Sequence, residues 1–147
     1  MRSIDPDLSN KTTETAHTPP DMGARSANVR GRFLRWLPAI LVMANIFIFS
    51  SIPSQELPKF GFWDTLVKKG GHVIGYGLLA LSYWFAMKWD IKRAWLAFLF
   101  AAIYALSDEF HQFFVPGRHA SWLDALVIDN GGATLALLAT WLVRKKK

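Results

Sequence analysis

Four apolar stretches, each close to the length of a membrane-crossing helix, dominate the sequence after its first 32 residues. They occupy about residues 36–52, 70–87, 93–113 and 124–143. A helix needs about 20 residues to cross the hydrocarbon core of a bilayer, because each residue adds ~1.5 Å along its axis. The stretches are apolar on all sides rather than along one stripe, which disfavours a soluble bundle. The sequence therefore predicts an all-α fold, namely an integral membrane bundle of four transmembrane helices in a lipid bilayer.

The first 32 residues differ from the rest in composition. Residues 1–29 contain no aromatic side chain and are rich in Ser, Thr, Pro, Asp and Asn. Such a segment buries too little apolar surface to offset its chain entropy. We therefore expect a disordered polar and basic tail over residues 1–32, followed by one membrane domain over residues 33–147. A cleaved signal peptide is the alternative for the first stretch, although its apolar core is longer than that of a typical signal.

Basic residues flank the apolar stretches and predict the orientation of the chain. They precede the first stretch, lie between the second and third, and close the chain over residues 144–147. With four spans these groups fall on one side, which the positive-inside rule places in the cytoplasm, so we expect both termini there. The net charge is +6, but basic residues that flank apolar stretches favour membrane topology, and we expect no nucleic-acid partner.

Polar residues lie at membrane depth near the outer ends of three expected helices. The apolar part of the third stretch, residues 94–106, is too short to cross a bilayer, so its polar end must lie within the membrane. Pro116 disfavours helix at the preceding residue and should end that helix. The same count of about 20 residues brings polar residues of the second and fourth stretches to this depth.

Ionisable groups at this depth are unfavourable unless paired or hydrated, so the cluster is a candidate functional site. A histidine would exchange a proton while a carboxylate orients its ring, and basic residues, with arginine as a planar fork, would hold an anionic group. The candidate catalytic residues are His72, Glu109, His111 and Asp124. The candidate ligand-binding residues are Lys69, Tyr76, Asp108, Gln112, Arg118, Asp129 and Asn130.

Four functions are compatible with this cluster. The first is a membrane-embedded enzyme or binding protein for an envelope ligand at the outer leaflet, either lipid-linked or glycopeptide. The second is a metal site formed by His72, His111 and a carboxylate, whose ligand types suit zinc; no cofactor is expected otherwise. The third is a proton-linked or small-solute carrier that uses Glu109 and Asp129. The fourth is a structural or assembly subunit, in which the polar groups only lock the helices together.

Charges gathered on one side favour the first function over the carrier, because a carrier needs a path to both faces. The sequence decides neither whether a bond is broken nor which oligomeric state the chain adopts.

The polar residues resemble those of the VanZ-like family of bacterial membrane proteins. The resemblance rests on the segments "KKGGHVIGYGLLAL" and "LSDEFHQFFVPGRHASWLDALVIDNGGA". The family is marked by a Lys-x-x-His-x-x-x-Tyr stretch, then Glu-x-His-Gln, a Pro-Gly-Arg turn and an Asp that opens the last helix. The matching residues are Lys69, His72, Tyr76, Glu109, His111, Gln112, Pro116, Gly117, Arg118 and Asp124.

The resemblance covers about residues 35–142 and implies a protein of the bacterial plasma (inner) membrane that works at the cell envelope. The family takes its name from a protein linked to low-level resistance to the glycopeptide teicoplanin, but the resemblance implies no particular reaction. In the family an acidic residue or Asn follows the Asp by one helical turn. Here Asp129 and Asn130 follow Asp124 by five and six residues.

Overall fold

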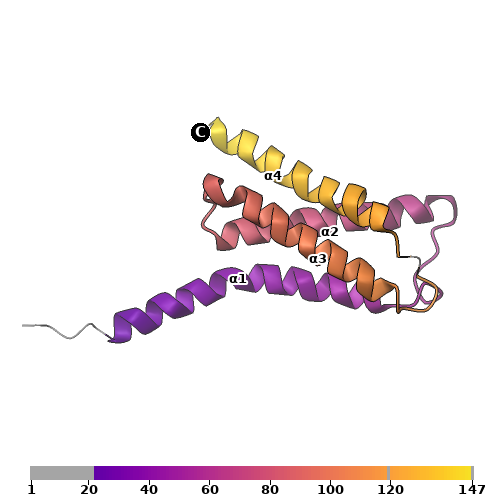
Figure 1. Ribbon diagram of the computed structural model, residues 1–147, viewed down its shortest axis with the longest axis horizontal. Coiled ribbons are helices and arrows are strands. Elements are labelled where there is room, and N and C mark those ends of the chain that lie inside the picture. Colours follow the sequence, from indigo (N-terminus) through magenta and orange to yellow (C-terminus); the bar gives the residue numbers. More distant parts are fainter. Residues whose placement is uncertain (1–21, 119, 147) are drawn as a thin grey trace, which may run out of the picture.

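The computed structural model describes residues 22–118 and 120–146, which form a bundle of four α-helices (Figure 1). No strand occurs in this part of the chain, so the all-α prediction is confirmed. The α-helices are α1 (Met22–Ser51), α2 (Asp64–Ala86), α3 (Ala94–Gln112) and α4 (Asn130–Lys145). Shorter segments are the 3₁₀-helices η1 (Gly61–Trp63) and η2 (Ile91–Arg93) and the π-helix η3 (Asp124–Asp129).

The four α-helices coincide with the four apolar stretches, and their ends follow local signals. α2 ends where Lys88 and Trp89 adopt positive φ angles of 62° and 58°. The side chain of Asp90 then accepts a hydrogen bond from the Lys92 N–H and caps η2, as acidic residues commonly do at helix starts. α3 ends four residues before Pro116, as expected from the restriction that proline places on the preceding residue.

The first helix extends further toward the N-terminus than the sequence predicted. α1 begins at Met22, so residues 22–32 are helical and not part of a disordered tail. The physical reason is that adding a residue to an existing helix is much easier than nucleating one, so the apolar helix continues into the polar segment. The remainder of the expected tail, residues 1–21, lies outside the described residues.

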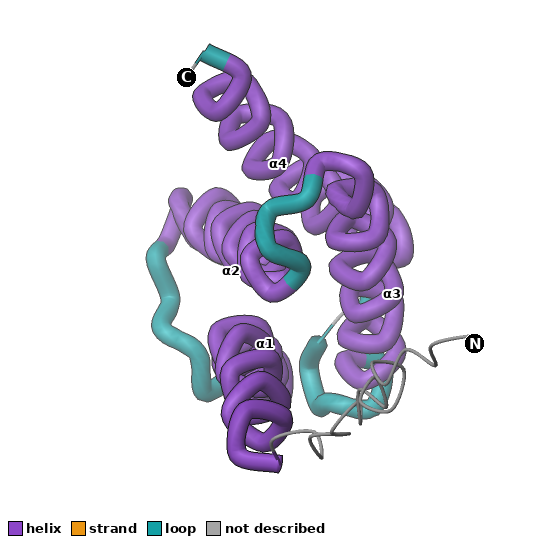
Figure 2. The backbone as a smooth tube through the Cα atoms, turned by 90° about the vertical axis from the view of Figure 1, so that its left-hand side faces the viewer, coloured by secondary structure: helices purple, strands orange, loops and turns teal. Residues whose placement is uncertain are grey.

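α2 lies at the centre of the bundle and contacts the other three α-helices. Consecutive helices run antiparallel (Figure 1), and Figure 2 shows α2 between α1 and α4 with α3 beside it. The core contains Leu79, Ala80 and Trp84 of α2 together with buried alanines that repeat every four residues along α3, namely Ala97, Ala101 and Ala105. Small residues on one helix face allow two backbones to come close, so this repeat sets the packing distance of α3.

The closest approach in the bundle joins α2 to α4. A Cβ atom added at Gly132 would collide with the backbone of Val73, and one added at Gly77 would meet the Gly132 carbonyl oxygen at 3.2 Å. A side chain at position 132 is therefore incompatible with the observed helix spacing. The crossing lies directly beside the polar site, because Val73 follows His72 and Gly132 closely follows Asp129.

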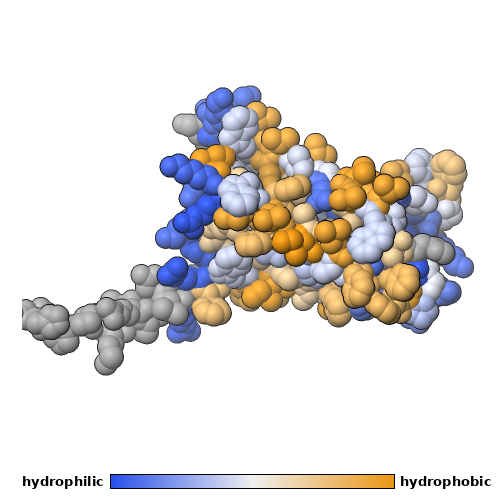
Figure 3. All heavy atoms as spheres, in the orientation of Figure 1, coloured by the Kyte–Doolittle hydropathy of each residue, from blue (hydrophilic) through white to orange (hydrophobic). Residues whose placement is uncertain are grey.

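The outer surface of the bundle is strongly apolar along its middle. Figure 3 shows hydrophilic residues at the two ends and hydrophobic residues between them on the face displayed. Exposed large apolar side chains occur on all four α-helices, among them Phe47, Ile74, Ile103 and Leu135. A continuous apolar surface of this kind marks a protein that meets another apolar phase.

Two helices have the length and composition needed to cross a membrane. They are residues Arg30–Ser51 and Asp124–Lys145, with mean hydropathies of 1.8 and 1.5. α2 and α3 lie outside that group because they carry the polar residues singled out by the sequence, which lower their hydropathy. By length and composition, the helices Arg30–Ser51 and Asp124–Lys145 are therefore candidates to cross a membrane.

Candidate functional site

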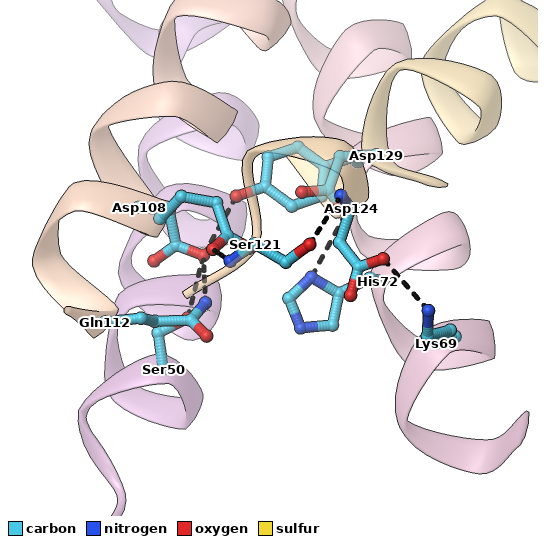
Figure 4. A network of polar contacts seen from close by, with 10 residues as sticks. Ser50, Lys69, His72, Asp108, Gln112, Ser121, Asp124 and Asp129 are labelled. Carbon is cyan, nitrogen blue, oxygen red and sulfur yellow. Dashed lines mark hydrogen bonds and ion pairs between the residues drawn. The ribbon is translucent and has the colours of Figure 1, made fainter. Parts of the chain in front are cut away.

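Polar side chains of α1, α2, α3 and η3 meet near the end of the bundle where α1 ends (Figure 4). Asp129 is 1% exposed, and Asp108 and Glu109 are each 3% exposed. Ser50 and Gln112 are buried beside them. Burying a carboxylate is unfavourable unless it is hydrogen-bonded or paired, so the contacts of each acid show what holds the cluster together.

Asp108 is the centre of a network that links three helices. Its Oδ2 accepts hydrogen bonds from Ser50 Oγ of α1 at 2.9 Å, from Tyr76 Oη of α2 at 3.0 Å and from Gln112 Nε2 of α3 at 3.0 Å. Three donors thus converge on one carboxylate oxygen. Asp108, Tyr76 and Gln112, which the sequence placed in one cluster, therefore do lie together, and Ser50 joins them.

A second set of contacts joins α2 to η3. Lys69 Nζ donates to Asp124 Oδ1 at 2.9 Å, and His72 Nδ1 lies 3.1 Å from Asp129 Oδ1. Lys69 and His72 are three residues apart and so share a face of α2. The two acids must likewise share a face, although they are five residues apart.

The π-helix η3 makes this pairing possible. Two side chains that are five residues apart on an α-helix point about 140° away from each other around the helix axis, because each residue adds a rotation of about 100°. In η3 the hydrogen bonds span five residues instead, as when the Asn130 N–H donates to the Ala125 carbonyl. This widened turn brings Asp124 and Asp129 to the side that faces α2. Single-turn π-helices inside α-helices occur frequently at functional sites.

Glu109 stabilises the start of the helical region formed by η3 and α4. Its Oε2 accepts a hydrogen bond from the Ser121 N–H at 2.7 Å. Ser121 in turn caps the helix, because its Oγ accepts from the Asp124 N–H at 3.3 Å, as expected of serine at an N-cap. A buried carboxylate at a helix N-terminus is also favoured by the helix dipole. Glu109 thus positions Asp124 through the backbone.

The side chains of His111 and Arg118 make their hydrogen bonds at the end of α1 and not with His72 or Asp124. His111 Nε2 is 3.0 Å from Ser51 Oγ, and its ring stacks on Phe47 with centroids 4.5 Å apart. Arg118 Nε donates to the Ile52 carbonyl at 3.1 Å, and its Nη2 donates to the Phe49 carbonyl. The expected meeting of all the candidate residues is therefore wrong for these two.

Arg118 occupies the C-terminal end of α1, where free carbonyl groups attract cations. Burial lowers the pKa of its guanidinium, while the charges of Asp108 and Glu109 raise it. An arginine stays protonated in either case. Arg118 therefore brings a positive charge to the edge of the site even though two of its nitrogens are bonded to the backbone.

Three buried oxygen atoms in the cluster have no hydrogen-bond partner among the described residues. They are Asp108 Oδ1, Asp129 Oδ2 and Asn130 Oδ1. A buried acceptor without a donor costs about 1–3 kcal/mol, and such groups are normally satisfied by a water, a proton or a ligand. The site therefore presents acceptors that a bound group could use.

Within the described ranges, no three His, Asp or Glu side chains form a metal-binding group. The histidines proposed as shared zinc ligands face different neighbours, since His72 contacts Asp129 and His111 contacts Ser51. Zinc sites in proteins use three or four such ligands around one point. The arrangement of the described side chains therefore does not support the zinc hypothesis.

A cleft of about 630 Å³ borders the polar cluster between α1 and α2. His72, Tyr76 and Ser50 form part of its wall. Asp129 holds His72 through Nδ1, and Nε2 has no hydrogen-bond partner in the described residues. A carboxylate that orients one imidazole nitrogen leaves the other for proton exchange with a ligand. The His72–Asp129 pair is thus the part of the cluster that is best placed for chemistry.

The sequence reasoning missed Ser50, Ser121 and the cleft itself. Ser121 carried a usable signal, because a serine three residues before an acid at a helix start is a capping pattern. Ser50 ends an apolar stretch in the segment "IFSS", but nothing in the sequence says that it faces Asp108. The cleft depends on how α1 and α2 diverge, which only the fold reveals.

A family model described as VanZ/LLP1 matches residues 33–144. The chain belongs to the VanZ/LLP1 family. The predicted family is thereby confirmed, and the VanZ/LLP1 match includes all four α-helices from Phe33 onward and every candidate site residue. Comparisons with curated proteins and with solved structures found no match.

Proposed function

We propose that the chain is a four-span protein of the bacterial plasma membrane with both termini in the cytoplasm. The apolar middle of the bundle and its polar ends support this arrangement (Figure 3). Basic residues lie toward the start of α1, in the α2–α3 turn and at the end of α4. Antiparallel packing brings these groups to one end (Figure 1), and the polar cluster lies near the other. The positive-inside rule then places the cluster on the extracytoplasmic side.

The proposed function is to bind, or to act on, a cell-envelope ligand that is lipid-linked or a glycopeptide. The observation that carries this proposal is the pair formed by the partly exposed His72 and the buried Asp129 at the wall of a cleft large enough for a ligand. Ligand sites commonly combine an apolar cleft of this size with a few polar groups. Membership of the VanZ/LLP1 family supports a link to glycopeptide resistance.

A purely structural role is the second candidate, and the Asp108 network favours it. Three hydrogen bonds on one carboxylate oxygen join α1, α2 and α3, as expected of a polar lock between membrane helices. Such a lock does not need His72 to border a cleft. We therefore place the structural role second. A proton-linked carrier is less favoured, because the polar groups gather at one end.

The topology can be tested with reporters fused at two positions. A reporter after Lys147 should be active only in the cytoplasm, and one inserted after Gly117 should be active only outside, because the chain crosses the membrane between them. Reporter activity in intact cells and protease access to the Gly117 insertion measure this directly. An external C-terminus would refute both the orientation and the extracytoplasmic site.

The function can be tested by deleting the gene and measuring susceptibility to envelope-targeting antibiotics. We expect a changed inhibitory concentration for glycopeptides such as teicoplanin, because the proposed ligand lies in the envelope, and no change for antibiotics with ribosomal targets. The wild-type gene on a plasmid should restore the original value. An unchanged profile across all envelope antibiotics would count against an envelope ligand.

A further inference from the structure

The cleft between α1 and α2 lies on the outside of the bundle. Its wall consists of residues from α1, from the α1–α2 loop and from α2, with Arg118 at its edge, and α3 and α4 contribute none of the lining residues. The cleft therefore opens toward whatever surrounds the helices rather than into the bundle interior. In a bilayer this surrounding phase is lipid.

The lining of the cleft changes in character along its length. α1 and α2 are antiparallel, so Val42 lies toward the same end as Leu78, and Ser50 toward the same end as Lys68. The middle and inner end are mostly apolar, with Val42, Ile46, Ile74 and Leu78, and Asn45 and Tyr76 are the polar residues there. The other end carries Lys68, Arg118 and His72 together with apolar residues of the α1–α2 loop, and no acidic side chain is among the described residues that line the cleft. One end thus suits hydrocarbon and the other suits an anion.

We propose that this cleft takes a membrane lipid with a phosphate-bearing headgroup from the outer leaflet. Its hydrocarbon chain would lie along the apolar walls, and its phosphate would lie between Lys68 and Arg118 beside His72. This inference rests on the proposed membrane function of the same site. The inference restricts the ligand to an anionic lipid that enters the cleft from the bilayer. It excludes a soluble ligand that enters from the aqueous side.

Lys68 and Arg118 can both serve such a headgroup, although each already has a partner. Lys68 Nζ is 2.6 Å from Asp64 Oδ2, but this i,i+4 pair is partly exposed, and exposed pairs contribute little to stability. Arg118 makes hydrogen bonds only to backbone carbonyls in the described structure. Its guanidinium has five N–H donors, so donors remain for a phosphate oxygen.

A soluble anion alone fits this cleft poorly. It would use the charged end and leave the apolar walls uncovered. A neutral lipid would cover the walls and leave two cations without a partner. Only an amphiphile with a phosphate uses both ends, because hydrocarbon burial and charge pairing act on different parts of one molecule.

The inference can be tested by photolabelling the full-length protein in phosphatidylcholine nanodiscs. The probes are a photoactivatable polyprenyl phosphate, a photoactivatable phosphatidic acid, and the polyprenol that lacks phosphate. Inorganic phosphate is added as a competitor. We expect either phosphate lipid to label peptides of α1 and α2 about tenfold more than the polyprenol does. The phosphate lipid that gives the stronger labelling identifies the preferred type of hydrocarbon chain. Inorganic phosphate should compete weakly.

A matched pair of glycine variants tests the place of binding. Gly71 lines the cleft and Gly70 does not, while a Cβ added at either residue meets no atom within 4 Å. Gly71→Leu should fill the cleft and lower labelling about tenfold, and Gly70→Leu should leave it near the wild-type level. Lys68→Gln should lower labelling by the phosphate lipids only, with Lys92→Gln at the opposite end as control. All variants are compared after confirming an unchanged elution profile.

Equal labelling by the polyprenol, full competition by inorganic phosphate, or normal labelling of Gly71→Leu would each overturn the lipid inference.

These results differ from those that test the proposed function, which is measured as antibiotic susceptibility in cells. If Gly71→Leu labels normally while His72→Asn loses the phenotype, the function stands and the lipid cleft is wrong. If Gly71→Leu blocks labelling while His72→Asn keeps the phenotype, lipid binding stands and the function of the polar site is wrong.

Discussion

Replacing His72 by asparagine should abolish the antibiotic-susceptibility effect of the protein while leaving it folded in the membrane. An asparagine amide can still donate to Asp129, 3.1 Å away in the native pair, but it cannot exchange a proton near neutral pH. Asp129→Asn should have the same effect, because it keeps the shape of the side chain and removes the charge that orients the imidazole. Inhibitory concentrations of a complemented deletion strain measure function, and immunoblots of membranes measure accumulation.

A tyrosine outside the cluster supplies the control for this experiment. Tyr104 donates to the Met43 carbonyl at 2.7 Å, so Tyr104→Phe removes one hydrogen bond outside the polar network and keeps the ring that packs near Tyr76. We expect it to lower stability by about 1 kcal/mol and to keep the phenotype. If His72→Asn instead lowers the melting temperature in step with the phenotype, the cluster is a structural lock. Removing one partner of a buried charge pair typically lowers the free energy of unfolding by about 3–5 kcal/mol. A melting assay detects a loss of this size.

Gly132→Ala should cause the largest loss of stability of any single methyl addition in the bundle. The added Cβ would collide with the carbonyl carbon, oxygen and Cα of Val73, which are backbone atoms and cannot rotate away. Overpacking of this kind costs about 1–3 kcal/mol, against a gain of up to about 1 kcal/mol for alanine over glycine in a helix. Thermal melting in detergent measures the difference.

The neighbouring glycine provides a matched control. A Cβ at Gly131 meets no atom within 4 Å, so Gly131→Ala should leave the melting temperature unchanged or raise it slightly. Gly132→Ala should also impair function, because pushing α4 from α2 separates Asp129 from His72. Equal melting temperatures for the two variants would show that the helices do not pack as closely as described.

Several features of the fold followed from the sequence because they depend on local properties. Apolar runs marked the positions of all four α-helices. Pro116 and the polar turn at Lys88–Asp90 marked where two of them end. The first apolar stretch was expected over about residues 36–52, and α1 begins earlier, at Met22, because an existing helix can extend into an adjoining polar segment.

The candidate site was predictable as a set of residues but not as a set of contacts. The depth of each polar residue followed from counting along a helix, so Lys69, His72, Asp108 and Asp129 could be assigned to one level. Their pairing depends on how each helix is rotated about its axis. That rotation also turned His111 toward Ser51 and drew Arg118 to the end of α1, and counting cannot reveal either contact.

By itself, the sequence determined the helical class and the positions of the four apolar helices. These properties follow from hydrophobicity and spacing along one dimension. Tertiary structure alone decided which side chains meet. The contact of Gly132 with Val73 sets the distance and rotation of α4 against α2, and the π-helix η3 turns Asp129 toward His72. Both depend on atoms far apart in the chain, because close packing between helices, not local preference, fixes how each helix is rotated.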